Sequence, residues 1–494
     1  METPTDSAPA KKRQIPYLRI SVGVAITLLL IYAGLWLYQF TLPSLSLWHN
    51  TTLSYEFDAD SAPADMTLAD YQELEGRLFR ELTSRIYDRL GETEGAGQGR
   101  FKAGSTMAPT AYPDNWNRTH ELPQPEARAG VLLLHGLSDS PYTMRGLAER
   151  LSKEQLWVVA LRLPGHGTTP SSLLQVEHED WQKVVALAMQ HLRTQLGADA
   201  SIYMVGYSNG GLLAVDYALA AMVGDQPVVP AGLTLLAPAL GVTPAAGYAW
   251  LPNQLSGLPG LQKLAWQSLL PPYDPYKYSS FTMNAATQIH DLIDDVKQRI
   301  RKQQTPAGGV PFPPTQVFAS IADATVDSTA SVTALLERLN PGRHHLYLYD
   351  INRSAWSELL FDRDFRQFPD DLLKRNHPFD VTLVTNADVD SRDVVLQTRF
   401  QGSDEVTTEA TDLKWPLEIY SLSHTAVPFA PGDPIYGDGS QRQAGMVNLG
   451  RIPARGESAL LNNDLARLQR LRYNPFYQWQ EDAIVQAIEA ASTR

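Results

Sequence analysis

Short, continuous runs of apolar residues, each followed by a turn and a helical stretch, restrict this chain to a small number of folds. Between Val131 and Pro238 the apolar runs are VLLLHG, LWVVALRLPGHG, SIYMVGYSNGG and GLTLLAP. Strands that are apolar at every position are buried on both faces, which indicates a parallel sheet covered by helices. Functional residues are then expected at the carboxyl ends of these strands.

A stretch rich in Pro, Gly and aromatic residues, residues 239–312, interrupts this pattern. PTQVFASIAD then predicts another strand, and further strands are predicted at Leu346–Tyr349 and Val381–Val384. The run WPLEIYSLSH, Trp415–His424, is predicted to be the last core strand. Helices are predicted near residues 285–302 and at about 478–491.

The third apolar run contains a Gly-x-Ser-x-Gly motif, from Gly206 to Gly210. A predicted strand before it and a predicted helix after it favour a nucleophile elbow. In that turn Ser208 adopts a strained conformation, and the two glycines let the strand and the helix approach each other. A plain turn that caps the helix is the alternative.

Two backbone amides are expected to stabilise the oxyanion formed when such a serine attacks a carbonyl. The first apolar run ends in His135-Gly136, where the glycine lets the backbone turn so that the amide of Leu137 faces the site. The amide of Asn209, directly after the serine, would lie beside it and complete the oxyanion hole. His135 itself is expected to stabilise the turn.

A serine nucleophile also needs a base and an acid, which follow it here in the order Ser, Asp, His. Asp323 ends the apolar run VFASIAD, and His424 ends the run IYSLSH. We therefore predict these two residues as the acid and the base. The alternatives are Asp327 and Asp350 for the acid, and His290, His344, His345 and His377 for the base.

The amino-terminal part predicts a membrane anchor. Residues 20–40 contain no charged side chain and as a helix would span about 32 Å, the thickness of a bilayer core. A basic cluster precedes them and none follows, which places the amino terminus in the cytoplasm and the remainder outside it, in a periplasm or the extracellular space. Trp36, Tyr38 and Trp48 lie where an aromatic belt is expected. A cleaved signal peptide and a buried core helix are the alternatives.

Charge and cysteine content exclude several kinds of site. The chain contains no Cys, so it forms no disulfide and no thiolate metal site. Its net charge is −13, and there is no basic run suited to a phosphate backbone. Nucleic acid is therefore not expected as a partner.

Five segments together resemble the α/β-hydrolase superfamily, particularly its monoglyceride lipases, carboxylesterases and serine aminopeptidase-like enzymes. They are LLLHGLSDSPYTMRGLAERL, VVALRLPGHGTTP, GYSNGG, IADATVD and SLSHTAVP. The resemblance implies an α/β-hydrolase fold with residues 239–312 as a cap over the site. It implies a triad and two oxyanion donors, namely Ser208, Asp323 and His424 with Leu137 and Asn209, and turn glycines at Gly136, Gly206 and Gly210.

The spacing of the predicted acid and base departs from that pattern. They are 101 positions apart, which is more than one helix and one strand need, so residues 340–412 are expected to be a second insertion. The expected organisation is a tail (1–19), an anchor (20–40), a stalk or pre-domain (41–128), hydrolase core (129–238), cap (239–312), core (313–339), insertion (340–412), and core with a closing helix (413–494).

These features predict a membrane-anchored serine hydrolase of acyl esters that requires no metal or organic cofactor. An aminopeptidase or amidase with the same triad, and a catalytically silent scaffold, are the alternatives. An aminopeptidase would need acidic groups in the cap to bind an amino terminus, and Asp291, Asp294 and Asp295 are candidates, although a solvated helix face is the simpler interpretation. Aromatic cap residues point to an apolar or lipid ester or to the core of the cap itself: Trp250, Trp266, Tyr273, Tyr276 and Tyr278.

Overall fold

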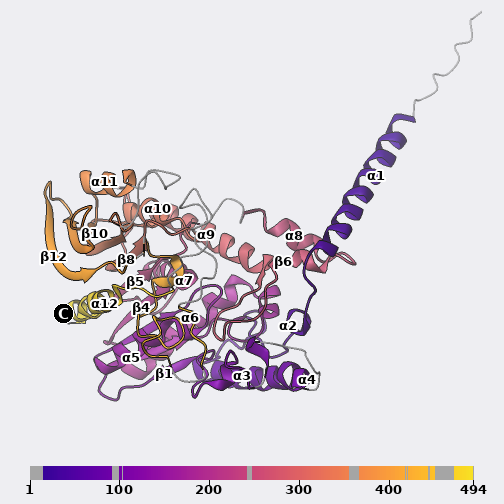
Figure 1. Cartoon of the computed structure of the whole chain (residues 1–494), viewed down its shortest axis with the longest axis horizontal. Helices are drawn as coiled ribbons and strands as arrows, with labels where there is room; N and C mark the ends of the chain where they lie inside the picture. The colour runs from indigo at the N-terminus through magenta and orange to yellow at the C-terminus, as the bar shows by residue number, and fades with distance from the viewer. Residues whose placement is uncertain are drawn as a thin grey trace, which may run out of the picture.

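The computed structural model describes most of the chain, and the whole is drawn in Figure 1. Residues 1–14 of the expected tail lie outside the described residues, as do parts of the expected pre-domain, cap, insertion and last core segment. The described ranges are 15–91, 99–102, 104–241, 247–306, 308–354, 366–417, 419, 421–442, 446–450 and 472–492.

One ten-stranded sheet runs through the protein in the order β1-β3-β2-β4-β5-β8-β9-β10-β11-β12. The strands from β3 to β10 in that order are parallel to their neighbours, whereas β1 and the β11–β12 hairpin are antiparallel additions at the two edges. The strands are β1 (His120–Leu122), β2 (Ala129–Leu134), β3 (Leu156–Leu161), β4 (Ser201–Tyr207), β5 (Gly232–Leu236), β8 (Thr315–Ser320), β9 (His344–Tyr349), β10 (Asp380–Asn386), β11 (Asp393–Arg399) and β12 (Val406–Lys414).

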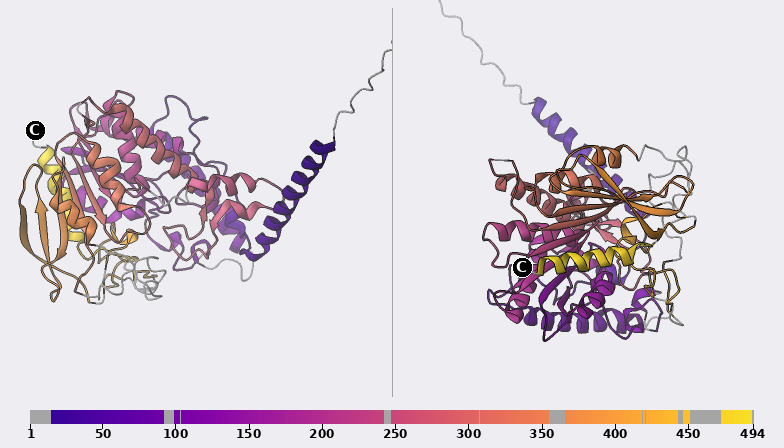
Figure 2. Two further views of the ribbon diagram at one scale, coloured as in Figure 1. Left: turned by 90° about the horizontal axis from the view of Figure 1, so that it is seen from above. Right: turned by 90° about the vertical axis from the view of Figure 1, so that its left-hand side faces the viewer.

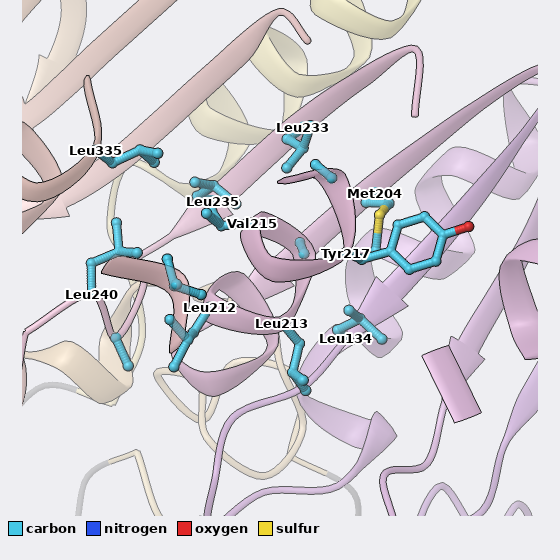
Figure 3. Close-up of a cluster of buried hydrophobic side chains, with 14 of the residues drawn as sticks. Leu134, Met204, Leu212, Leu213, Val215, Tyr217, Leu233, Leu235, Leu240 and Leu335 are labelled. Atoms are coloured by element: carbon cyan, nitrogen blue, oxygen red, sulfur yellow. The ribbon is translucent and has the colours of Figure 1, made fainter. Parts of the chain in front are cut away.

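Helices cover both faces of the sheet, which is why its central strands are apolar at every position. Leu132 and Leu134 face the side of α6 (His178–Leu196), α7 (Asn209–Met222) and α9 (Met283–Gln303). Val131 and Leu133 face the side of α5 (Arg145–Lys153) and α12 (Tyr477–Ser492). Figure 3 shows side chains of α7 meeting those of neighbouring strands on the first of these faces. The predicted α/β fold with a mostly parallel sheet is confirmed.

The region expected to form the cap contributes to two different parts of the molecule. α8 (Trp250–Leu255) and the short strands β6 (Trp266–Ser268) and β7 (Phe281–Thr282) lie beyond the sheet. By contrast, α9 packs against the core through Leu292, Val296 and Ile300. Only the first turns of α9 therefore contribute to the cap, where they lie next to α8.

Residues 340–412 continue the main sheet. β9 pairs in parallel with β8, and β10 pairs in parallel with β9. The hairpin of β11 and β12 then extends the sheet, and β12 forms its exposed edge. The remaining helices on this side are α10 (Ser328–Ala330) and α11 (Gln367–Lys374).

The prediction of a last core strand at Trp415–His424 is wrong. Among its described residues the chain forms no strand, and His424 begins a short 3₁₀ turn, His424–Ala426. The side of β8 on which such a strand would pair is occupied by β9. Two apolar residues of the run, Trp415 and Leu422, are nonetheless inaccessible to solvent.

The amino-terminal helix α1 (Ile15–Tyr38) projects away from the body (Figures 1 and 2). Its apolar segment, Ile20–Thr41, has a mean hydropathy of 2.2 and is not buried within the protein. Trp36 and Tyr38 at its end are exposed, but Trp48 is buried against Phe101, so the expectation that Trp48 belongs to an aromatic belt is wrong. The helices that follow are α2 (Leu47–Asn50), α3 (Leu68–Leu82) and α4 (Asp88–Gly91).

Candidate active site

Ser208 occupies a strained turn between β4 and α7. It is the residue directly before α7, and its φ of +54° lies in the left-handed region that side chains rarely adopt. Strand and helix approach closely here, because a Cβ on Gly206 would lie 2.2 Å from the carbonyl oxygen of Gly210. A Cβ on Gly210 would in turn lie 2.3 Å from the carbonyl oxygen of Leu134 in β2. Glycine is required at both positions to hold the serine at this turn.

Three of the predicted site residues form one hydrogen-bonded chain. The Oγ atom of Ser208 lies 3.0 Å from Nε2 of His424, and Nδ1 of His424 lies 2.7 Å from Oδ2 of Asp323. The other carboxylate oxygen of Asp323 accepts hydrogen bonds from the backbone amides of Thr325 at 2.8 Å and Val326 at 3.0 Å. All three side chains are buried, so the carboxylate is fixed toward the imidazole.

A loop rather than a strand holds His424 in place. The hydroxyl of Ser320, the last residue of β8, donates to the carbonyl oxygen of Leu422 at 2.7 Å. The hydroxyl of Tyr207 donates to the carbonyl oxygen of His424 at 3.3 Å, and the two rings are 5.1 Å apart. The strands that carry the serine and the acid thus also anchor the loop that carries the imidazole.

Of the two predicted oxyanion donors, one shares a cavity with Ser208 and the other follows it directly in the chain. Leu137 lines the cavity above the serine, and Asn209 is the first residue of α7. Within the described residues, neither backbone amide donates a hydrogen bond to another protein group. Both N–H groups are therefore available to a ligand at this position.

His135 fixes the peptide group that contains the Leu137 amide. Its Nε2 accepts the backbone N–H of Leu163 at 3.1 Å, so its Nδ1 carries the proton and donates to the carbonyl oxygen of Gly136 at 2.9 Å. That carbonyl and the N–H of Leu137 belong to the same peptide. Burial, with a contribution from neighbouring His166, lowers the pKa of His135 to about 3, which keeps the ring neutral.

The rival acids have other partners. Asp350, at the end of β9, accepts two hydrogen bonds from Arg353, at 2.7 and 3.0 Å, and one from the hydroxyl of Thr385 at 2.7 Å. Asp327 caps α10 and accepts the backbone amide of Thr329 at 2.9 Å. No hydrogen bond between either carboxylate and His424 occurs in the part of the chain that the structure describes.

The rival bases lie away from Ser208. His290 is on α9, near Asp291 and Asp294. His344 and His345 begin β9 and line a separate cavity of about 440 Å³, at the opposite end of the strands from Asp323. Nε2 of His377 donates to the carbonyl oxygen of Leu372 at 3.1 Å. Among the described residues, no cluster of His, Asp and Glu side chains is suited to a metal ion.

A cavity of about 770 Å³ opens above Ser208 and His424. Most of its wall is apolar. Most of these apolar residues come from α8 and the residues before it, from β7 and from the start of α9, namely Tyr248, Ala249, Leu251, Pro252, Phe281, Met283, Ala286 and Ile289. The cap aromatic residues singled out in the sequence are not among its described lining residues. Trp266, Tyr276 and Tyr278 are buried elsewhere, and Trp250 is exposed.

One ion pair in the wall of this cavity is not predicted by the sequence. Lys277 contacts the carboxylate of Asp139, which is 138 positions earlier in the chain, and its ammonium group lies 5.8 Å from the ring centre of Tyr207. Burial alone would raise the pKa of Asp139, but the charge and hydrogen bond of Lys277, with the hydroxyl of Thr143, lower it overall. No local pattern marks either residue, because only the fold brings them together.

Comparison with known proteins gives one family match and one match to a characterised relative. A family model described as serine aminopeptidase, S33, matches residues 125–364. A thermostable monoacylglycerol lipase from Bacillus sp. (strain H-257) is 36% identical over 84 residues, which are 17% of this chain and 32% of that protein. The chain thus aligns with about a third of the length of this relative.

Solved structures of lipolytic enzymes are also similar in part. One of these structures comes from work on LipS and LipT, two metagenome-derived lipolytic enzymes. It is 21% identical to this chain, the alignment covers 47% of this chain and 87% of the other, and the TM-score is 0.38. A monoacylglycerol lipase from Paleococcus ferrophilus is 21% identical, with coverages of 47% and 88% and a TM-score of 0.35.

The family match runs through the part of the chain that forms the sheet. It spans the strands from β2 to β9 and therefore includes the turn that carries Ser208 and the strand before Asp323. A mostly parallel sheet with helices on both faces is the arrangement that the sequence predicts for this region. The chain has the α/β-hydrolase fold, and its residues 125–364 match a family of hydrolases with that fold.

Proposed function

We propose that this protein is a membrane-anchored serine hydrolase that cleaves carboxylic esters of apolar acids. The observation that carries the proposal is the hydrogen-bonded chain from Ser208 through His424 to Asp323, at 3.0 and 2.7 Å, beneath an apolar cavity. This is the geometry that a serine needs to lose its proton as it attacks a carbonyl.

The first half of the reaction transfers the acyl group to the enzyme. Oγ of Ser208 attacks the ester carbonyl carbon while Nε2 of His424 accepts the hydroxyl proton. Asp323 accepts a hydrogen bond from Nδ1–H and stabilises the imidazolium. The amides of Leu137 and Asn209 bind the oxyanion, and the imidazolium then protonates the departing alcohol as the bond between carbon and the leaving oxygen breaks.

The second half releases the acid. A water molecule attacks the acyl-serine carbonyl and gives its proton to His424, forming a second oxyanion in the same position. The tetrahedral intermediate collapses with cleavage of the bond to Oγ, and His424 returns the proton to Ser208. This reaction uses no group beyond the side chains and amides already described.

The cavity supports an apolar acyl group as the substrate. Aliphatic and aromatic side chains form most of its wall, and its volume of about 770 Å³ falls within the range that encloses small-molecule ligands. The Asp, Glu, Lys, Arg and His side chains of its described lining are the proposed base and the pair of Asp139 with Lys277, whose charges neutralise each other. A lipid ester fits this lining better than a charged peptide.

The contacts of the cap acids disfavour an aminopeptidase, the second candidate. Asp291, Asp294 and Asp295 do not belong to the described lining of the cavity, and about half of each side chain is exposed. Asp294 lies near His290 and Lys297, and Asp295 near His178. The family match to a serine aminopeptidase keeps this activity as the alternative to be tested.

Membrane anchoring by α1 is the second part of the proposal. The length and apolar character of Ile20–Thr41 fit a bilayer core, and the segment is not buried in the protein. We assign the amino terminus to the cytoplasm, because the basic cluster precedes the helix. The catalytic domain would then act outside the cytoplasm.

The experiment is a comparison of ester and amide hydrolysis by the full chain in detergent micelles. Chromogenic esters with acyl chains from two to sixteen carbons, and an aminoacyl anilide, would be offered to the wild type, Ser208→Ala and Ser201→Ala. We expect turnover of esters that rises with acyl length and falls by roughly a million-fold in Ser208→Ala.

Ser201 provides the matched control, since it begins the same strand β4 at the end away from the cavity. Ser201→Ala should hydrolyse esters like the wild type. Turnover of the anilide alone would favour the aminopeptidase, and equal turnover by wild type and Ser208→Ala would disprove the assignment of the nucleophile.

A further inference from the structure

The end of α1 is attached to the segment that covers the cavity. The ammonium group of Lys263 donates to the carbonyl oxygens of Gln39 at 3.0 Å and Leu42 at 2.8 Å, and the backbone amide of Lys263 donates to Oε1 of Gln39 at 3.0 Å. The side-chain amide of Gln39 donates in turn to the carbonyl oxygen of Gly260. The same region appears beside the base of α1 in Figure 1, where α8 approaches it.

A further contact lies along the apolar part of α1 itself. The hydroxyl of Tyr32 donates to the carbonyl oxygen of Pro259 at 2.6 Å. Tyr32 precedes the end of the helix at Tyr38 by six residues, about 9 Å along the axis. If α1 spans a membrane, the residues around Pro259 lie deeper in the bilayer than the point at which the helix leaves it.

The segment directly before Lys263 is uncharged and largely apolar. Residues 247–262 contain no Asp, Glu, Lys or Arg. Four large side chains of this segment, which we call the cap patch, are exposed: Tyr248 by 73%, Trp250 by 52%, Leu251 by 47% and Leu258 by 42%. Soluble surfaces rarely expose such a group of side chains without a partner.

The cap patch adjoins the cavity above Ser208. Tyr248 and Leu251 belong both to the patch and to the lining of the cavity. An apolar molecule resting on the patch is therefore next to the wall of the proposed acyl site.

We propose that the cap patch inserts into the leaflet of the bilayer from which α1 emerges, and that the substrate is a lipid ester taken directly from that leaflet. The contact between Tyr32 and Pro259 sets the depth, and the exposed Trp and Tyr side chains suit the interfacial region. The choice of substrate rests on the proposed hydrolase function, whereas the insertion of the patch does not.

Site-directed spin labelling of the full chain in phosphatidylcholine vesicles tests the insertion without reference to activity. Because the chain contains no Cys, Trp250→Cys and Leu258→Cys each provide a single labelling site. Val389→Cys is the control. Val389 is 61% exposed in the turn between β10 and β11, and β10 lies at the end of the body away from α1 (Figure 1).

Collision of the nitroxide with molecular oxygen and with a water-soluble nickel chelate reports its depth. We expect the labels at positions 250 and 258 to collide with the chelate at least about fivefold less often than the label at 389 does. They should collide with molecular oxygen more often than with the chelate. Equal access of the chelate at all three positions would overturn the proposal.

Substrate delivery is tested by Trp250→Glu and Val389→Glu, neither of which changes a lining residue of the cavity. We expect Trp250→Glu to lower hydrolysis of a sixteen-carbon ester dissolved in the vesicles by at least about tenfold, with a water-soluble two-carbon ester hydrolysed as before. Equal loss on both esters, or loss on neither, would contradict delivery from the leaflet. If the wild type hydrolyses neither ester, the proposed function fails, while the spin labels still decide whether the patch is inserted.

Discussion

Asp323 and Asp350 follow neighbouring strands, and their surroundings give the two carboxylates different roles. Asp323 contacts His424 at 2.7 Å and accepts two backbone amides, whereas Asp350 is neutralised by Arg353 and accepts the hydroxyl of Thr385. The sequence alone left both as candidates, since each follows an apolar strand. Only the positions of the neighbouring side chains distinguish them.

Replacement of each acid by its amide should therefore have different effects. Asp323→Asn is expected to lower kcat roughly a thousand- to ten-thousand-fold, because the amide cannot stabilise the imidazolium or hold its tautomer. Asp350→Asn is expected to lower the free energy of unfolding by roughly 1–3 kcal/mol, with turnover per folded molecule unchanged. Ester hydrolysis and denaturant unfolding of both variants measure this, and the reverse result would identify Asp350 as the acid.

At the scale of elements, α3 is held against the hydrolase core by buried polar contacts. Tyr71 donates to the carbonyl oxygen of Arg162 at 2.9 Å, and Glu75 accepts the amide and the hydroxyl of Thr119 at 3.1 and 2.7 Å. Arg162 forms an ion pair with Glu56. This helix thus packs on the body through a charged network as well as through its apolar face.

Glu75 should make the stability of this packing depend on pH. Burial raises its pKa to about 7, although Arg162 and the hydrogen bonds from Thr119 lower it in part. Between its ordinary pKa, 4.5, and about 7, the folded protein keeps a proton that the unfolded chain has released. The free energy of unfolding must therefore fall as pH rises through this range, by about 3 kcal/mol from this group.

Glu75→Gln removes that dependence, and Glu73→Gln on the same helix is the matched control. Glu73 is exposed and pairs with Arg77, so its replacement should leave the pH dependence of the free energy of unfolding unchanged. Urea unfolding of the full chain in detergent between pH 4 and 8 gives the comparison. A Glu75→Gln curve parallel to that of the wild type would show that folding does not raise the pKa of Glu75.

At the scale of the whole molecule, the sequence predicts what depends on local pattern. The parallel sheet was predictable because burial on both faces makes each strand continuously apolar, and the turn at Ser208 because its glycines are required by close approach. Trp415–His424 was not, because a strand forms only where a neighbouring edge is free, and β9 occupies the position beside β8. The pair of Asp139 and Lys277 was missed because its members are far apart in the chain.

The central claim is that Ser208 is an activated nucleophile, and covalent trapping tests it most directly. The full chain in detergent micelles would be treated with an alkyl fluorophosphonate, which bonds its phosphorus to an activated serine oxygen and releases fluoride. We predict one phosphonyl group per chain, located on Ser208 by peptide mass mapping, and none on Ser208→Ala. An unmodified wild type, or equal modification of both proteins at another residue, would contradict the account.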